Sequence, residues 1–133
     1  DYADGIYRAF PFDTRHGWNI QNFGPFYIPA AGSTIPIDTS NYSLYQRIIT
    51  HETQTPLYIR RGQIYLDDSL IRQYTFRKNW YFIAGDKVFD SRDSRYIGPI
   101  PEDFIVGKAS FILTSKDPYT KDYVWRRFFK KIK

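Results

Sequence analysis

Short apolar segments separated by turn-forming residues run along most of the chain, a pattern typical of β structure. Residues 57–60 and 63–66 are two such segments, and they flank Arg61-Gly62. We expect a tight hairpin here, in which the glycine supplies the positive φ that such turns need. Further along, Tyr74 and Phe76 alternate with polar neighbours, which predicts that both rings lie on one face of a strand.

Other segments predict further strands. Pro36 restricts residues 34–37 to the edge of a sheet, because proline cannot donate a ladder hydrogen bond. Residues 44–50 follow a turn at residues 38–43, and no segment has a helical period longer than about two turns. The remaining expectations are an irregular arm at 1–22, a short strand at 26–28, a buried strand at 80–83, a long strand at 104–114 that bends near Gly107, and a final strand or short helix at 123–132.

Composition favours a single β domain. The chain has 133 residues, which fits one domain. Aromatic residues make up 20% of it, and such residues suit half-buried pleated surfaces. Eight prolines and eight glycines argue against long helices. The expected fold class is mainly β, with antiparallel sheets and few short helices, in one domain that covers residues 1–133.

Charge and cysteine content narrow the function classes only slightly. The net charge of +5 fits a solvated basic surface, an anionic membrane surface or a nucleic-acid partner. The chain has no cysteine, which excludes disulfides and thiolate metal sites. No apolar run reaches the roughly 18 residues of a membrane span. The chain begins with Asp1 and contains no methionine, so we expect it to be part of a longer protein.

The most unusual segment is residues 85–95, which read Gly-Asp-Lys-Val-Phe-Asp-Ser-Arg-Asp-Ser-Arg. Three carboxylates, three cations and two hydroxyls lie within these eleven residues. Such a group can form an ion-pair and hydrogen-bond network that fixes a loop beside a site. The alternative is a solvated, charged turn.

This segment resembles the signature of bacterial type I signal peptidases, which has the form G-D-N-x-x-x-S-x-D-S-R-x-x-G-x-V-P. The matching positions are Gly85, Asp86, Ser91, Asp93, Ser94, Arg95, Gly98 and Pro101. The match continues through residues 101–109, which are similar to the family's P-E-D-x-I-V-G-K-A. Residues 23–29 and 41–45 also resemble Bacteroides-like members. The resemblance implies the antiparallel, LexA-like β fold of these peptidases.

The resemblance also implies a chemistry and roles for the matched residues. The family uses a Ser nucleophile activated by a neutral Lys, whose pKa must be lowered by its surroundings. By position, Ser91 matches the residue that orients this Lys, and Asp93 and Arg95 match an ion pair that holds the loop. Asp86 matches a second acidic position of that network. Gly85 and Gly98 belong to the structural motif, as do Gly107 and Ala109, where small residues let backbones approach closely. Ser94 is expected to face away and has no assigned role.

The chain departs from the family pattern in three respects. Gly98-Pro99-Ile100 replaces the usual Gly-Phe-Val. Lys87 and Val88 stand where the family has Asn and then Arg. Neither member of the catalytic pair is found, and both are expected before Asp1, so the chain alone should be inactive. Ser33 lies in a Gly-Ser-Thr-Ile-Pro segment that weakly resembles the nucleophile motif, but it lacks the Met of that motif and matches a later family segment instead.

The C-terminal run combines aromatic rings with cations: Trp125, Arg126, Arg127, Phe128 and Phe129. One interpretation is contact with an anionic bilayer, where rings lie at the headgroup level and cations meet acidic lipids. A second is single-stranded nucleic acid, and a third is a final strand with one buried face. The family resemblance favours the membrane, and we expect no nucleic-acid partner.

Other candidate chemistry is weak. His16 and His51 are the only histidines, and neither has a metal-ligand spacing. The pair Asp67-Asp68 lies in an expected turn, where carboxylates usually cap and solvate rather than act on a glycoside. No metal and no organic cofactor are implied.

The sequence therefore predicts part of a membrane-anchored serine endopeptidase, a hydrolase that removes signal peptides from exported preproteins. Its partners would be signal peptides and the membrane surface, and the domain would lie on the extracytoplasmic (periplasmic) side of the plasma membrane. The alternatives are a non-catalytic binding module on the same scaffold and, more weakly, a basic nucleic-acid binder.

Overall fold

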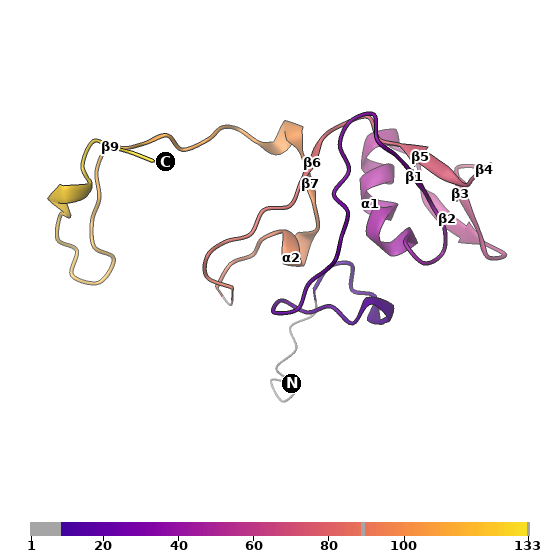
Figure 1. Ribbon diagram of the computed structural model, residues 1–133, viewed down its shortest axis with the longest axis horizontal. Coiled ribbons are helices and arrows are strands. Elements are labelled where there is room, and N and C mark those ends of the chain that lie inside the picture. The colour runs from indigo at the N-terminus through magenta and orange to yellow at the C-terminus, as the bar shows by residue number, and fades with distance from the viewer. Residues whose placement is uncertain (1–8, 89, 133) are drawn as a thin grey trace.

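The computed structural model describes residues 9–88 and 90–132. Within them the chain is mainly β, with antiparallel strand pairs and two short α-helices, as the sequence predicts. In Figure 1, helix α1 and strands β1–β5 form one end of the molecule, and the β6–β7 pair and α2 lie in the middle. An extended segment connects them to the C-terminal residues at the other end.

Helix α1 (Tyr42–Thr53) is the main departure from the predicted fold. The expectation that no helix exceeds about two turns is wrong, because α1 has 12 residues. Its buried residues, Leu44, Tyr45, Ile48 and Ile49, recur at helical spacing and face the core. The two isoleucines in this stripe also suit a strand, so the apolar pattern alone did not separate the two structures.

The predicted hairpin is confirmed. Strand β2 (Leu57–Arg60) pairs with β3 (Gln63–Leu66), and β3 pairs with β4 (Ser69–Ile71) in a three-stranded sheet. Arg61 and Gly62 have φ angles of 51° and 76°, and a type I′ turn requires positive φ at both central residues. The register of the sheet is therefore set by this turn.

A second, two-stranded sheet joins β1 (Thr34–Pro36) to β5 (Gln73–Thr75). The hydroxyl oxygens of Thr34 and Thr75, which are opposite each other in the register, lie 2.7 Å apart. The prediction for the two rings is also confirmed, since Tyr74 and Phe76 are both buried. They enter the core that α1 covers.

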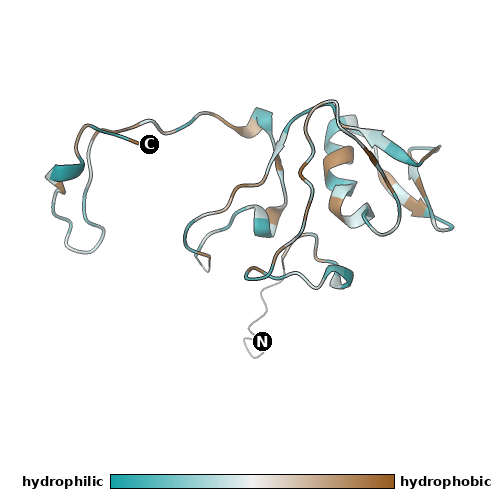
Figure 2. Cartoon of the chain, in the orientation of Figure 1, coloured by the Kyte–Doolittle hydropathy of each residue, from teal (hydrophilic) through white to brown (hydrophobic). Residues whose placement is uncertain are grey.

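One hydrophobic core connects the helix to these sheets. Figure 2 shows hydrophobic residues on α1 and on the strands beside it. The buried members of the core are Phe10, Ile37, Leu44, Tyr45, Ile48, Ile49, Leu57, Ile64, Tyr74, Phe76 and Trp80. The core therefore draws on α1, both sheets and the entry arm.

Strand β6 (Trp80–Tyr81) pairs with β7 (Ile100–Pro101) and closes the chain between them into a loop. Helix α2 (Ser94–Ile97) lies within this loop. The expectation of a buried strand at 80–83 is only partly correct. Trp80 is buried, but the side chains of Tyr81 and Ile83 are 44% and 51% exposed, because only one face of this segment meets the core.

The long strand expected at residues 104–114 does not form. A 3-10 turn, η3 (Glu102–Phe104), is followed by extended chain, and only β8 (Phe111–Ile112) pairs, with β9 (Lys130–Lys131). Among the described residues, residues 105–109 pair with no strand, and only Ser110, whose carbonyl accepts from Ile132 N at 3.0 Å, extends the β8–β9 contact. Residues 123–132 contain both kinds of structure expected there, the 3-10 turn η4 (Trp125–Arg127) and β9.

The entry arm is irregular, as predicted for its described part, with one 3-10 turn, η2 (Thr14–His16). The strand expected at residues 26–28 is wrong. Phe26 instead packs its ring against Phe10 and Tyr45, at centroid distances of 5.7 Å in both cases. Phe26 and Ile28 pack against the core, whereas the Tyr27 side chain is exposed, and the segment pairs with no strand.

Candidate functional site

Asp93 and Arg95 form the centre of the 85–95 loop. The Asp93 Oδ2 and Arg95 Nη2 atoms lie 2.5 Å apart, and Arg95 Nε donates to Asp93 Oδ1 at 2.9 Å. Both residues are buried, at 9% and 8% exposure. Two parallel bonds of this kind fix the relative orientation of the two side chains. The structure thus brings together the two residues that the sequence pairs.

The pair also holds the backbone of Gly85, ten residues before Arg95. Gly85 N donates to Asp93 Oδ2 at 2.8 Å, and Arg95 Nη2 donates to Gly85 O at 3.2 Å. The pKa of Asp93 is lowered to about 2, chiefly by the hydrogen bond from the Arg95 side chain. Burial opposes this shift, and the backbone N–H groups of Gly85 and Arg95 add to it. The carboxylate is therefore ionised wherever the loop is folded at neutral pH.

Ser94 provides a second connection across the loop, and sequence reasoning missed it. The sequence assigns Ser94 no role, but its side chain is fully buried. Ile83 N donates to Ser94 Oγ at 3.0 Å, and Ser94 N donates to Ile83 O at 3.0 Å. Ser94 is the first residue of α2, after the N-cap Asp93. Nothing in its spacing signals burial, so only the folded loop identifies it.

Ser91 lies against Gly85. A Cβ atom placed on Gly85 would stand 2.2 Å from Ser91 Oγ and 2.9 Å from Ser91 Cβ, so only glycine allows the serine this position. Ser91 is half-buried, and no other described residue hydrogen-bonds to its hydroxyl. The hydroxyl is therefore held in place by packing and keeps its hydrogen-bonding capacity.

The other predicted residues differ in how closely they pack against the rest of the chain. Gly98 has φ 80° and ends α2, and a Cβ there would meet the Phe10 ring at 2.7 Å. Asp86 is exposed and makes no hydrogen bond or ion pair with another described residue, so it lies outside the network in which it was expected. Gly107 has open space around it and Ala109 is exposed. The close backbone approach expected at these two residues is absent from the described chain.

Glu52, at the end of α1, is a second residue that sequence reasoning missed. Its carboxylate accepts hydrogen bonds from Tyr74 Oη (2.9 Å), Trp80 Nε1 (2.8 Å), Arg77 N (2.9 Å) and Lys78 N (3.1 Å). Glu52 thus connects the helix to β5 and to the start of β6. Because β6 leads into the 85–95 loop, this carboxylate helps to position the loop on the core.

Ser33 and His16, two weaker candidates from the sequence, have hydrogen-bond partners outside the 85–95 loop. Ser33 Oγ donates to Ala30 O at 2.6 Å, and His16 Nε2 lies 3.1 Å from Ser43 Oγ. In the part of the chain that the structure describes, there is no group of three or more His, Asp or Glu residues arranged to hold a metal ion. No helix among these residues is both long and apolar enough to cross a bilayer.

Comparison with known protein families identifies the class to which this scaffold and loop belong. The family model described as "Signal peptidase, peptidase S26" matches residues 32–114. This match covers more than half of the chain and includes the whole 85–95 loop, and the chain belongs to this family of serine peptidases. No curated protein and no solved structure matches the chain.

Proposed function

We propose that this chain is the supporting part of a Ser/Lys endopeptidase that removes signal peptides from exported preproteins. The observation that carries the proposal is the arrangement of the 85–95 loop. The Asp93–Arg95 pair fixes Gly85, and the fixed glycine in turn positions the hydroxyl of Ser91. These contacts favour a loop fixed beside a site over a solvated charged turn.

In this proposal, Ser91 is a positioning residue. A Lys base works at neutral pH only when its ammonium form is disfavoured and its amine points at the nucleophile. The Ser91 hydroxyl would hydrogen-bond to that amine and orient it. The Lys and the Ser nucleophile would come from protein outside these 133 residues, and in the described part no serine hydroxyl is hydrogen-bonded to a lysine.

We assign contact with the membrane surface to the C-terminal hairpin, residues 110–132. A concave surface of the hairpin is lined by Arg126, Arg127, Lys130 and Lys131, together with Ile112 and Ile132. None of these lining residues is acidic. Cations near an anionic leaflet gain about 1 kcal/mol each, so this surface suits lipid phosphates.

Aromatic rings adjoin these cations. The indole of Trp125 stacks on Phe128 with centroids 4.8 Å apart, and its side chain is 74% exposed. Phe129 is 71% exposed. Exposed rings beside cations are typical of residues that lie at the headgroup level of a bilayer. Such contact would place the domain against the membrane on its extracytoplasmic side, where the substrates emerge.

A processing assay tests the proposed function. The full-length protein that contains this chain is reconstituted in vesicles with a preprotein whose cleavage junction has small residues. We expect cleavage at this junction, and we expect a bulky residue placed there to prevent it. Binding of the preprotein without any cleavage would contradict the proposal and support a non-catalytic binding module. The sequence feature that favours such a module is the presence of Lys87 and Val88 where the family has Asn and Arg.

A further inference from the structure

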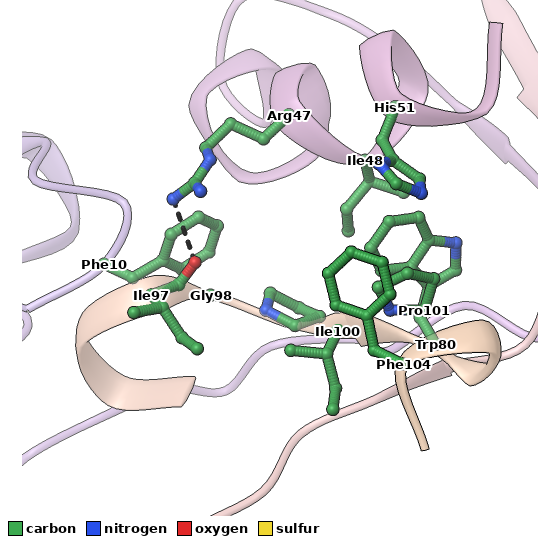
Figure 3. A pocket seen from close by; sticks show the side chains of 11 residues that line it. Phe10, Arg47, Ile48, His51, Trp80, Ile97, Gly98, Ile100, Pro101 and Phe104 are labelled. Atoms are coloured by element: carbon green, nitrogen blue, oxygen red, sulfur yellow. Dashed lines mark hydrogen bonds between the residues drawn. The ribbon is translucent and has the colours of Figure 1, made fainter. Parts of the chain in front are cut away.

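A small pocket lies between α1 and the chain at residues 97–104 (Figure 3), and no residue of the 85–95 loop lines it. Its volume is about 190 Å³, enough for one apolar side chain or a short acyl chain. Most of its wall is apolar. The apolar contributors are mainly Phe10, Ile48, Trp80, Ile100, Pro101 and Phe104.

The two polar side chains that line the pocket both come from α1. Arg47 and His51 are one helical turn apart, so they lie on the same face of the helix, and Figure 3 shows Ile48 between them. Arg47 Nη1 donates to Ile97 O at 2.9 Å. This single bond anchors the guanidinium at the rim and leaves its other N–H groups unpaired within the described residues.

His51 is held at the other end of the pocket by two aromatic rings. Its ring meets Trp80 and Phe104 edge to face, with centroid distances of 5.5 Å and 5.8 Å. Phe104 is itself 62% exposed, although it forms part of an apolar wall. A ligand in the pocket would cover this ring, which gives binding a hydrophobic driving force.

No carboxylate lines the pocket, and the acidic residues nearby are engaged elsewhere. Glu102 accepts a hydrogen bond from Asn79 at 2.8 Å, and Asp103 pairs with Lys78. Glu52, next to His51 in the chain, has the four donors described above. The pocket therefore has an apolar interior, with the guanidinium of Arg47 and the imidazole of His51 at its edges. No carboxylate in its wall neutralises the guanidinium.

We infer that this pocket binds a short apolar chain that ends in a carboxylate. The chain would enter between Ile48, Ile100 and Phe104, and its carboxylate would accept hydrogen bonds from Arg47 at the rim. The ligand can come from two sources, a fatty acid or the C-terminal residue of a peptide, because both present the same chemistry. This site lies apart from the 85–95 loop and does not depend on the proposed peptidase activity.

The test uses the 133-residue chain and two probes, hexanoate and N-acetyl-leucine, with binding measured by amide chemical-shift changes in NMR titrations. Hexanamide is the matched uncharged probe. We expect hexanoate to bind roughly tenfold more tightly than hexanamide, the factor expected for a hydrogen bond between charged groups. The largest shift changes should fall on residues 97–104 and on α1. Tighter binding of N-acetyl-leucine than of hexanoate would identify the peptide source, and the reverse would identify the fatty acid.

The matched variants are Arg47→Gln and, as a control, Arg72→Gln, an exposed arginine that does not line the pocket. Arg47→Gln should weaken hexanoate binding roughly tenfold, and Arg72→Gln should leave it unchanged. Equal binding of hexanoate and hexanamide to the wild-type chain would overturn the inference, even if Arg47→Gln failed to fold. Shift changes confined to other parts of the chain would also overturn it.

Discussion

At the scale of single residues, Gly85 carries the tightest steric constraint in the candidate loop. Gly85→Ala would place a methyl group 2.2 Å from Ser91 Oγ, so the loop must move to admit it. We expect a loss of about 1 to 3 kcal/mol in the free energy of unfolding, measured by urea denaturation. Gly107→Ala is the control, because Gly107 has open space around it. Equal stability of the two variants would contradict the packing described for Ser91.

Asp93 gives the loop a pH dependence. Its pKa in the folded chain is lowered to about 2, chiefly by Arg95, so the ionised carboxylate stabilises the fold above the ordinary carboxyl pKa of about 4. That contribution is lost as the pH falls from about 4 through 2.

The variant that isolates this effect is Asp93→Asn. It should lower the free energy of unfolding at pH 7 by about 3 kcal/mol, because it leaves the buried guanidinium of Arg95 without its counter-charge. The difference from the wild type should shrink as the pH is lowered to about 2. Urea midpoints of both proteins between pH 7 and pH 2 provide the measurement. A difference that does not change with pH would exclude the ion pair as its cause.

At the scale of elements, Glu52 connects α1 to the strands that precede the loop. Glu52→Gln keeps the size of the side chain but removes the charge and one acceptor oxygen, while four donors remain. We expect a loss of about 2 kcal/mol, measured as a lower melting temperature. Glu102→Gln is the matched control, since Glu102 is exposed and accepts one bond, from Asn79. A larger effect at Glu102 would refute the assigned connection.

Elements differ in how far the sequence predicts them. The β2–β3 hairpin was predictable because Arg61-Gly62 has a local requirement for positive φ. Helix α1 was not, since its isoleucines and aromatic residues suit either structure. The strand at residues 104–114 failed for a different reason, because a strand needs a partner and apolar pattern does not supply one. Element type is thus predictable where the constraint is local.

In the candidate site too, features set by the local sequence were predictable and features set by distant contacts were not. The family motif located Ser91, Asp93 and Arg95, and the last two do form the expected pair. Neither the burial of Ser94 nor the position of Glu52 could be predicted, because each depends on contacts with chain far away in the sequence. Asp86 matches the motif by spacing, yet it is exposed, since spacing does not determine the direction of a side chain in a loop.

At the scale of the whole molecule, the C-terminal hairpin is set apart from the core and joined to it by extended chain (Figure 1). If its cations meet lipid phosphates, removing two of them with Arg126→Gln and Arg127→Gln should cost about 2 kcal/mol, or roughly thirtyfold in affinity. Co-sedimentation with vesicles that contain phosphatidylserine measures this. Arg60→Gln with Arg72→Gln removes the same charge from the α1 end of the molecule and should change binding far less.

Two outcomes would contradict the membrane assignment. Equal affinity of the two double variants would show that net charge alone, and not the hairpin, attracts the vesicles. Steeply salt-dependent binding of a single-stranded oligonucleotide, with no binding of vesicles, would assign the hairpin to nucleic acid instead.

The most direct test of the central claim is the rate of signal-peptide cleavage by the full-length protein when Ser91 is replaced by Ala. The account predicts that kcat falls about tenfold or more, the factor expected for one hydrogen bond to the catalytic Lys, while KM and the melting temperature stay the same. A kcat equal to that of the wild type, or a loss that follows a lower melting temperature, would contradict the role of Ser91.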